Sequence, residues 1–222
     1  MTGPVHNRLV RQIRDKHVTV AAEKYLTGCL LDIGCGEKPL AALVAPYVSH
    51  HVGVDHPGTP HDRSRIDVYG TAYALPFADC TFDSAMCNAV LEHLEEPEEG
   101  LRECFRALRP GGYAVYTAPF IWHVHEEPRD FYRYSPFGLR HLFSKAGFEI
   151  VEVIALSGFW VTFGQLFAYN VARFNRGPIK RLRLLDPLLL LIQGVAYALD
   201  KLDKSERWSW AHLVVARKPV DS

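Results

Sequence analysis

A glycine-rich turn directly after an apolar run is the first feature of this sequence that could do chemistry. It lies in LLDIGCGEKPL, residues 30–40, and holds Gly34 and Gly36. Glycines let a backbone approach a ligand closely and adopt torsions that a side chain would forbid. A strand that turns on such glycines into a helix is typical of nucleotide-binding loops.

The third glycine of the dinucleotide-binding pattern G-x-G-x-x-G is missing, because the chain has Pro39 at that position. A pyrophosphate needs a helix N-terminus with free backbone donors close by, and a proline removes one of those donors. The turn therefore favours a nucleoside ligand without phosphates, such as S-adenosylmethionine (SAM). It disfavours a nicotinamide-dependent oxidoreductase.

Two acids end apolar runs at places where such a ligand could be held. Asp32 ends the run before the turn, and Asp55 ends the next run, HHVGVD. In an open α/β sheet, ligands bind beyond the carboxyl ends of the strands. We expect Asp55 to accept hydrogen bonds from ribose hydroxyls and Asp32 to lie near the amino-acid part of SAM. His50 and His51 begin the second run, and we assign them no role.

A dense group of polar side chains lies in WHVHEEPRDFYRYS, residues 122–135. His125 is the preferred general base, since histidine exchanges a proton near neutral pH, and Tyr132 is the second candidate. The segment also offers side chains that could bind an acceptor: His123, Asp130 and Arg133. The alternative is that Asp130 pairs with Arg133 and only scaffolds the loop.

A metal site is not expected from the sequence. His123 and His125 with Glu126 and Glu127 could be ligands, but no other part of the chain supplies matching spacing. His93, in the stretch LEHL, either lines the substrate mouth or is a packed histidine.

The elements that must position these residues alternate between apolar runs and helical patterns. Strands are predicted at 29–33, 51–55, 65–69, 81–87, 112–117, 148–155 and 211–217. Helices are predicted at 4–26, 39–47, 97–108 and 136–146. Such alternation predicts an α/β fold with a mostly parallel sheet covered on both faces.

The overall composition excludes some functions. Lys plus Arg and Asp plus Glu number 25 each, so there is no global basic field for nucleic acid. The five cysteines form no CxxC pair and are interpreted as reduced thiols. The charged start predicts no signal peptide, and no apolar run is long enough for a membrane span. We expect a cytoplasmic protein.

The segment 157–205 interrupts the alternation with two apolar helical stretches joined by a basic run, RGPIKRLRLLD. A cationic turn beside apolar helices suits an inner-membrane surface or an anionic lipid-linked substrate. The alternatives are a lid, or a dimer or partner-facing helix pair, with the charges solvated.

Four spaced motifs carry a resemblance to a known family. LLDIGCG, VGVDHPG, TAYALPFADCTFDSAMCNAVLEHL and LRECFRALRPGGYAVYTAP are similar to the class I SAM-dependent methyltransferases, type 11 branch. The resemblance covers residues 28 to about 155 and the last strand. It implies a Rossmann-like, doubly wound sheet of seven strands in the order 3-2-1-4-5-7-6, with strand seven antiparallel. The skeleton from His125 to Ser135 resembles a sub-branch linked to cell-surface sugars and lipid-linked intermediates.

The resemblance implies which residues hold the cofactor. Where the family usually has Gly-Asp-Ala, this chain has Gly70-Thr71-Ala72, so the adenine contact weakens or passes to the Thr71 hydroxyl. The implied cofactor-binding residues are Asp32, Gly34, Cys35, Gly36, Asp55, His56, Thr71, Ala72 and Asn88.

The predicted organisation is an N-terminal helix at 1–27, a SAM-binding methyltransferase domain at 28–156 and 206–219, and the inserted helical hairpin at 157–205. The predicted function is methyl transfer from SAM to a small-molecule or glycolipid-like acceptor, at oxygen. The alternative is a catalytically weak binding or scaffold protein with the same fold, associated with a membrane or partner.

Overall fold

Seven strands form one sheet in the computed structural model, which describes residues 4–59, 61–203 and 205–221. The order across the sheet is β3-β2-β1-β4-β5-β7-β6. In chain order the strands are β1 (Cys29–Ile33), β2 (His50–Asp55), β3 (Val68–Tyr69), β4 (Phe82–Asn88), β5 (Leu108–Pro119), β6 (Glu149–Ala155) and β7 (Ala211–Arg217). Strand β7 runs antiparallel to both of its neighbours, and the other pairs are parallel. The predicted fold class and strand order are confirmed.

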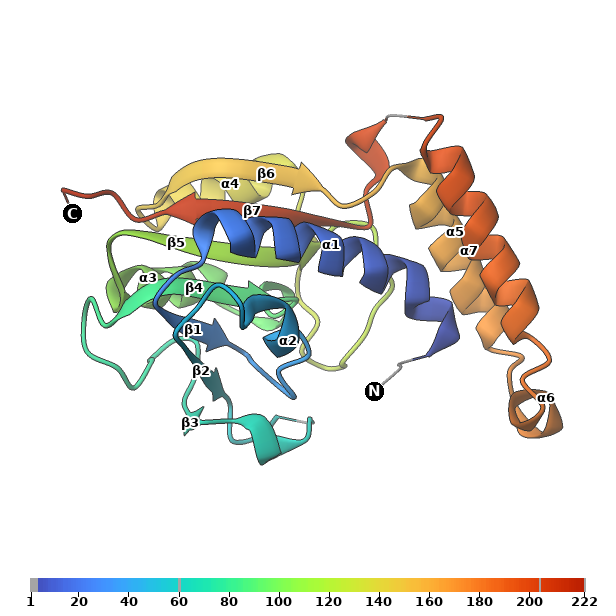
Figure 1. Ribbon diagram of the computed structural model, residues 1–222, viewed down its shortest axis with the longest axis horizontal. Coiled ribbons are helices and arrows are strands. Elements are labelled where there is room, and N and C mark those ends of the chain that lie inside the picture. The colour runs from blue at the N-terminus through green and yellow to red at the C-terminus, as the bar shows by residue number, and fades with distance from the viewer. Residues whose placement is uncertain (1–3, 60, 204, 222) are drawn as a thin grey trace.

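Helices cover both faces of the sheet (Figure 1). One face carries α1 (Arg8–Tyr25) and α2 (Ala41–Val44), whose apolar side chains share a core with β1 and β7. The other face carries α3 (Pro97–Ala107) and α4 (Pro136–Lys145), packed on β4 and β5. Because a parallel sheet is buried on both faces, its strands are continuous apolar runs. That is why the strands were readable in the sequence.

A helical hairpin lies beyond the sheet (Figure 1). It consists of α5 (Phe159–Ala172), the short α6 (Gly177–Arg181) and α7 (Asp186–Asp200). Helices α5 and α7 pack closely at Gly164, where an added Cβ would lie only 2.5 Å from Ala196 Cβ. In the described part of the chain, no helix is both long and apolar enough to cross a membrane.

Three predicted boundaries were wrong. The strand expected over 65–69 is only Val68–Tyr69, and the helix expected over 39–47 is only Ala41–Val44. The strand expected over 112–117 is Leu108–Pro119, so it continues through Pro110 and Gly111, which had suggested a turn. Gly111 makes this possible with a φ of 81°, and Gly111 N donates to Lys218 O at 2.9 Å. Short 3-10 turns at Val5–Asn7 (η1), Arg63–Arg65 (η2), Leu91–His93 (η3) and Glu206–Trp208 (η4) complete the fold.

Candidate active site

The glycine turn after β1 is held by the neighbouring strand β2. Gly34 N and Cys35 N both donate to Val54 O, at 2.9 and 3.1 Å. Gly36 N donates to Asp55 Oδ2 at 2.7 Å, and Asp55 Oδ1 accepts from His56 N at 2.7 Å. The carboxylate at the end of β2 therefore fixes the turn at the end of β1.

Both glycines of the turn have positive φ, 68° at Gly34 and 48° at Gly36. Their surroundings differ. A Cβ on Gly34 would lie 2.4 Å from Val90 Cγ2, whereas a Cβ on Gly36 would lie 3.5 Å from its nearest neighbour, His61 Cδ2. Gly34 is thus required for packing as well as for the backbone conformation, while Gly36 is required mainly for the conformation.

Asp32 is buried and pairs with His51, a residue that was assigned no role from the sequence. His51 Nε2 lies 2.8 Å from Asp32 Oδ2. Burial raises the pKa of Asp32, and the hydrogen bond with His51 opposes that rise. The parallel register sets His51 opposite Leu30, two residue pairs before Asp32 and Gly53, so its side chain reaches Asp32 across the β1–β2 pair. His51 thus contacts a predicted cofactor residue, which the sequence analysis did not foresee.

A cavity of about 880 Å³ lies at the carboxyl ends of β1, β2 and β4. Both polar and apolar residues line it, and the apolar ones include Met86, Val90 and Leu94. Of the residues predicted to bind the cofactor, the following line it: Asp32, Gly34, Cys35, Gly36, Asp55, His56 and Asn88. The lining also includes His93, together with Glu126 and Arg129 from the segment after β5.

Two predicted cofactor residues, Thr71 and Ala72, are not among the residues that line this cavity. Thr71 forms an isolated β-bridge with Ala74, and Ala72 packs against the core between the sheet and α3. Their assignment to the adenine stays a prediction from the family resemblance. Burial raises the pKa of the lining Cys35 thiol to about 12, so this cysteine is an inert part of the wall.

The segment 122–135 is scaffolded by one ion pair. Both terminal nitrogens of Arg133 lie 2.6 Å from the carboxylate oxygens of Asp130. Arg133 also donates to the backbone oxygens of Trp122 and His123, and Asp130 accepts from His125 N at 2.8 Å. The hydrogen bonds from Arg133 hold the pKa of Asp130 well below its ordinary value. Asp130 and Arg133 were predicted to bind an acceptor, but in the structure their charges and hydrogen-bonding groups already pair with each other.

The other predicted residues of this segment lie at different places. Tyr132 donates its hydroxyl to Glu95 O at 2.9 Å. His123 packs its ring against Tyr169 of α5, with 4.3 Å between the ring centroids. Neither is among the residues that line the cavity.

A cluster beside the cavity joins His93, which lines the cavity, to His125 and Glu92, which are not among its lining residues. The sequence analysis missed Glu92. Glu92 Oε1 lies 3.9 Å from His93 Nε2 and 3.8 Å from His125 Nε2. The Glu92 residue has 0% of its surface exposed, and neither carboxylate oxygen has a hydrogen-bond partner among the described residues. Burial raises the pKa of Glu92 to about 8 and lowers that of His125. The sequence signal was a Glu-His pair between two leucines in LEHL, which also suits a solvated turn.

Comparison with known proteins agrees with this geometry. Residues 31–116 match the family model described as a methyltransferase domain. A probable S-adenosylmethionine-dependent methyltransferase of Mycolicibacterium smegmatis is 31% identical over 138 residues, which are 60% of this chain and 52% of that protein. A ubiquinone biosynthesis O-methyltransferase of Chromobacterium violaceum is 29% identical over 130 residues, 51% of this chain and 53% of its own length. The chain thus spans about half the length of these relatives.

Among solved structures, the crystal structure of the [4+2]-cyclase SpnF is similar, with a TM-score of 0.62 and 25% identity over 94% of this chain and 82% of that chain. The fold, the site at the strand ends and the match over residues 31–116 are similar to those of SAM-dependent methyltransferases, and they support SAM as the cofactor. The residues present suit this cofactor, because two carboxylates and a glycine turn face a cavity with an apolar wall.

Proposed function

We propose that the protein transfers a methyl group from SAM to a hydroxyl oxygen of an amphiphilic small molecule, such as a lipid-linked acceptor. The observation that carries this proposal is the position of the Glu92, His93 and His125 cluster beside the cofactor cavity. Bound SAM supplies a methyl group on a sulfonium, so the protein mainly has to hold the acceptor in line and exclude water. A hydroxyl acceptor must also lose its proton, and the cluster offers groups that can receive it.

Each part of the site has a place in this proposal. Asp55 and the glycine turn would hold the ribose, and Asp32 would lie near the amino-acid part of the cofactor. The acceptor oxygen would lie at the mouth near His93, which lines the cavity, with His125 as the candidate base behind it. The relative named as an O-methyltransferase supports oxygen as the atom that is methylated.

The helical hairpin supports the amphiphilic acceptor. Many apolar side chains of α5 and α7 are exposed, including Phe163, Phe167 and Leu191. They border an apolar groove of about 310 Å³ between the two helices. Exposed basic residues lie around α6 at the tip of the hairpin: Arg173, Arg176, Lys180, Arg181 and Arg183. A basic tip beside an apolar surface is the combination that binds anionic membranes, so we propose peripheral contact with a membrane surface through 157–205.

Cofactor binding and methyl transfer are tested separately. S-adenosylhomocysteine at a hundred times its dissociation constant should stabilise the folded protein by about 2.7 kcal/mol and so raise its melting temperature. NADH should leave the melting temperature unchanged. Labelled SAM is then supplied with extracted membrane lipids and with water-soluble phenols and sugars. We expect label in the lipid fraction. Stabilisation by NADH and not by S-adenosylhomocysteine would overturn SAM as the cofactor. Cofactor binding without transfer to any acceptor would support the scaffold alternative.

Membrane contact is tested by sedimentation with vesicles. The protein should sediment with vesicles that contain anionic lipid and much less with neutral ones. Replacing Lys180 and Arg181 with glutamate should abolish this binding, because each basic residue near an anionic surface contributes about 1 kcal/mol. A matched control changes Arg63 and Arg65, which are also exposed but lie in η2 near β3. Equal loss with both pairs would contradict a role for the hairpin tip.

A further inference from the structure

The cluster beside the cavity has the composition and orientation of a metal site, although the sequence analysis expected none. Among the described residues, Glu92, His93 and His125 offer one ligand atom each within 4.8 Å of one another. A buried carboxylate with both oxygens unpartnered is costly unless something compensates it. The side chain faces two imidazole nitrogens rather than a cationic side chain.

Both histidines present the same ring nitrogen to Glu92. His93 Nδ1 lies 2.5 Å from Arg129 O, a carbonyl oxygen that can only accept, so Nδ1 carries the proton. His125 Nδ1 faces two acceptors, His123 O at 3.3 Å and Asp130 Oδ2 at 3.4 Å, whereas a donor, Arg133 Nη2, lies farther away at 3.5 Å, so the proton is assigned to Nδ1 here too. Both Nε2 atoms are therefore left with a free lone pair toward Glu92. Metal-binding histidines are typically oriented in this way, by donating the other ring N–H to a carbonyl or carboxylate.

The three side chains would have to move only modestly to surround one metal ion. In a tetrahedral site with ligand bonds of about 2.0–2.2 Å, neighbouring ligand atoms lie roughly 3.3–3.5 Å apart. Here Glu92 Oε1 lies 3.9 and 3.8 Å from the two Nε2 atoms, and all three ligand atoms lie within 4.8 Å of one another, so side-chain movements of about an ångström would close the set. Glu126 Oε2 lies 3.8 Å from His93 Nε2 and can supply a fourth ligand. Since Glu126 and His93 line the cavity, the remaining coordination positions would face it.

We propose that Glu92, His93 and His125 bind one divalent transition-metal ion, of which Zn²⁺ and Mn²⁺ are the best candidates. Two imidazoles and one carboxylate suit these ions better than Mg²⁺ or Ca²⁺, which prefer all-oxygen sites. Binding of the ion does not depend on the proposed function. If that function holds, an ion at the mouth would lower the pKa of an acceptor hydroxyl bound to it, and His125 would be a ligand in place of a free base.

The experiment measures metal binding without SAM or acceptor. Untagged protein is freed of metal with a chelator and titrated with Mn²⁺ by electron paramagnetic resonance, and with Co²⁺ by visible absorption. We expect saturation at one ion per chain. Glu92→Gln and His125→Asn should each weaken binding at least tenfold. The matched controls His50→Asn and His141→Asn, at exposed histidines elsewhere, should leave it unchanged.

Three results would overturn the metal site: absence of saturable binding, unchanged binding in both variants, or thiolate-to-cobalt charge-transfer absorption, which would place the ion on cysteine. Circular dichroism checks that each variant is folded. If the buried Glu92→Gln variant fails this check, His125→Asn, at a partly exposed residue, still decides the outcome. Metal binding with no methyl transfer would leave this inference intact and count against the proposed function alone.

Discussion

Asp55 illustrates how one side chain can serve both the fold and the ligand. Its two carboxylate oxygens accept backbone hydrogen bonds from Gly36 and His56, at the floor of the cofactor cavity. Each carboxylate oxygen has a further lone pair. Asp55 can therefore keep the turn in place and still accept from a ribose hydroxyl.

Asp55→Ala should weaken the binding of S-adenosylhomocysteine by more than tenfold, since the loss of hydrogen bonds to a charged group costs roughly 1.5–3 kcal/mol. Asp55→Asn keeps one acceptor oxygen and should lose less. Asp79→Ala, at an acid whose side chain is 74% exposed, is the control and should bind normally. Calorimetry measures all three, and normal affinity in Asp55→Ala would remove this residue from the cofactor site.

The two glycines of the turn should respond differently to alanine. Both substitutions force a side chain into the left-handed region, at about 1–2 kcal/mol. Only Gly34→Ala adds a clash, with Val90 Cγ2 at 2.4 Å. Urea unfolding should therefore show a larger loss of stability for Gly34→Ala than for Gly36→Ala, with cofactor affinity reduced most at Gly34. Equal losses of stability would contradict the packing role of Gly34.

The residues that the sequence revealed are those whose chemistry is local. Gly34, Gly36 and Asp55 could be found because a glycine turn and a strand-end acid are recognisable within a few positions. His51 and Glu92 could not, because their partners come from other segments: Asp32 across a parallel register, and His125 from beyond β5. When the role of a residue depends on strand register or on a contact with a distant loop, the residues next to it in the sequence do not reveal that role.

At the scale of elements, the segment 122–135 connects the turn η3 with the residues that line the cavity. It packs on η3, where Phe131 N donates to Glu92 O at 2.9 Å and the Tyr134 hydroxyl donates to Leu91 O at 2.9 Å. It spans the cavity mouth, where Glu126 faces His61 at 3.7 Å and His93 at 3.8 Å. The Asp130–Arg133 pair keeps this irregular backbone in one shape.

Asp130→Asn should loosen this segment, because it weakens the pairing that holds Arg133. Hydrogen–deuterium exchange of 122–135 should rise at neutral pH, while exchange in β4 stays the same. The pKa of Asp130 is lowered in the folded protein, so its contribution is present above the ordinary aspartate pKa of about 4 and is lost as the pH falls through the lowered value. The wild type should therefore approach the variant only in strong acid. Unchanged exchange in Asp130→Asn would show that packing alone holds the segment.

Strands and helices could be predicted where consecutive residues are buried. They were harder to predict where distant strand pairing sets the boundary of a strand. The apolar runs of β1 and β4 placed these strands to within one residue, since most of their side chains are buried. The start of β5 was missed because Pro110 and Gly111 usually end a strand, whereas here Lys218 of the chain end pairs with this stretch. That pairing partner lies more than a hundred residues away in the sequence, so no local pattern could reveal it.

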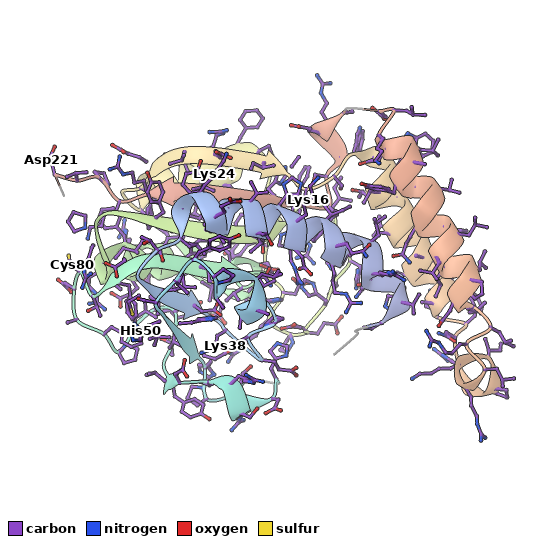
Figure 2. The ribbon with its side chains drawn as sticks, viewed as in Figure 1. Lys16, Lys24, Lys38, His50, Cys80 and Asp221 are labelled. Atoms are coloured by element: carbon purple, nitrogen blue, oxygen red, sulfur yellow. The ribbon has the colours of Figure 1, made fainter. Side chains whose placement is uncertain are left out.

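At the scale of the whole molecule, the hairpin is fastened to the start of the chain. The buried Gln193 of α7 accepts from Leu9 N at 2.8 Å and donates to Val5 O at 3.0 Å. Gln165 of α5 donates to Asn7 Oδ1 at 3.0 Å. In Figure 2, Cys80 lies at the end of the molecule away from the hairpin.

Gln193→Ala should destabilise the protein by roughly 1–3 kcal/mol, because it leaves buried backbone groups without partners. Gln12→Ala, at an exposed position of α1, should change stability by less than about 0.5 kcal/mol. Thermal unfolding compares the two. A similar melting temperature for Gln193→Ala and the wild type would mean that the hairpin does not depend on this contact.

The position of β5 has a consequence for how such proteins can diverge. The family match ends at residue 116, within β5, whereas the segment over the cavity mouth and the hairpin both follow this strand. The chain before this point carries the glycine turn, the strand-end acids, Glu92 and His93, whereas the segment 122–135 and the hairpin come after it. A lineage can therefore change much of the proposed acceptor surface by altering the second stretch. Similarity over residues 31–116 supports SAM as the methyl donor, and the molecule that receives the methyl group has to be found by experiment.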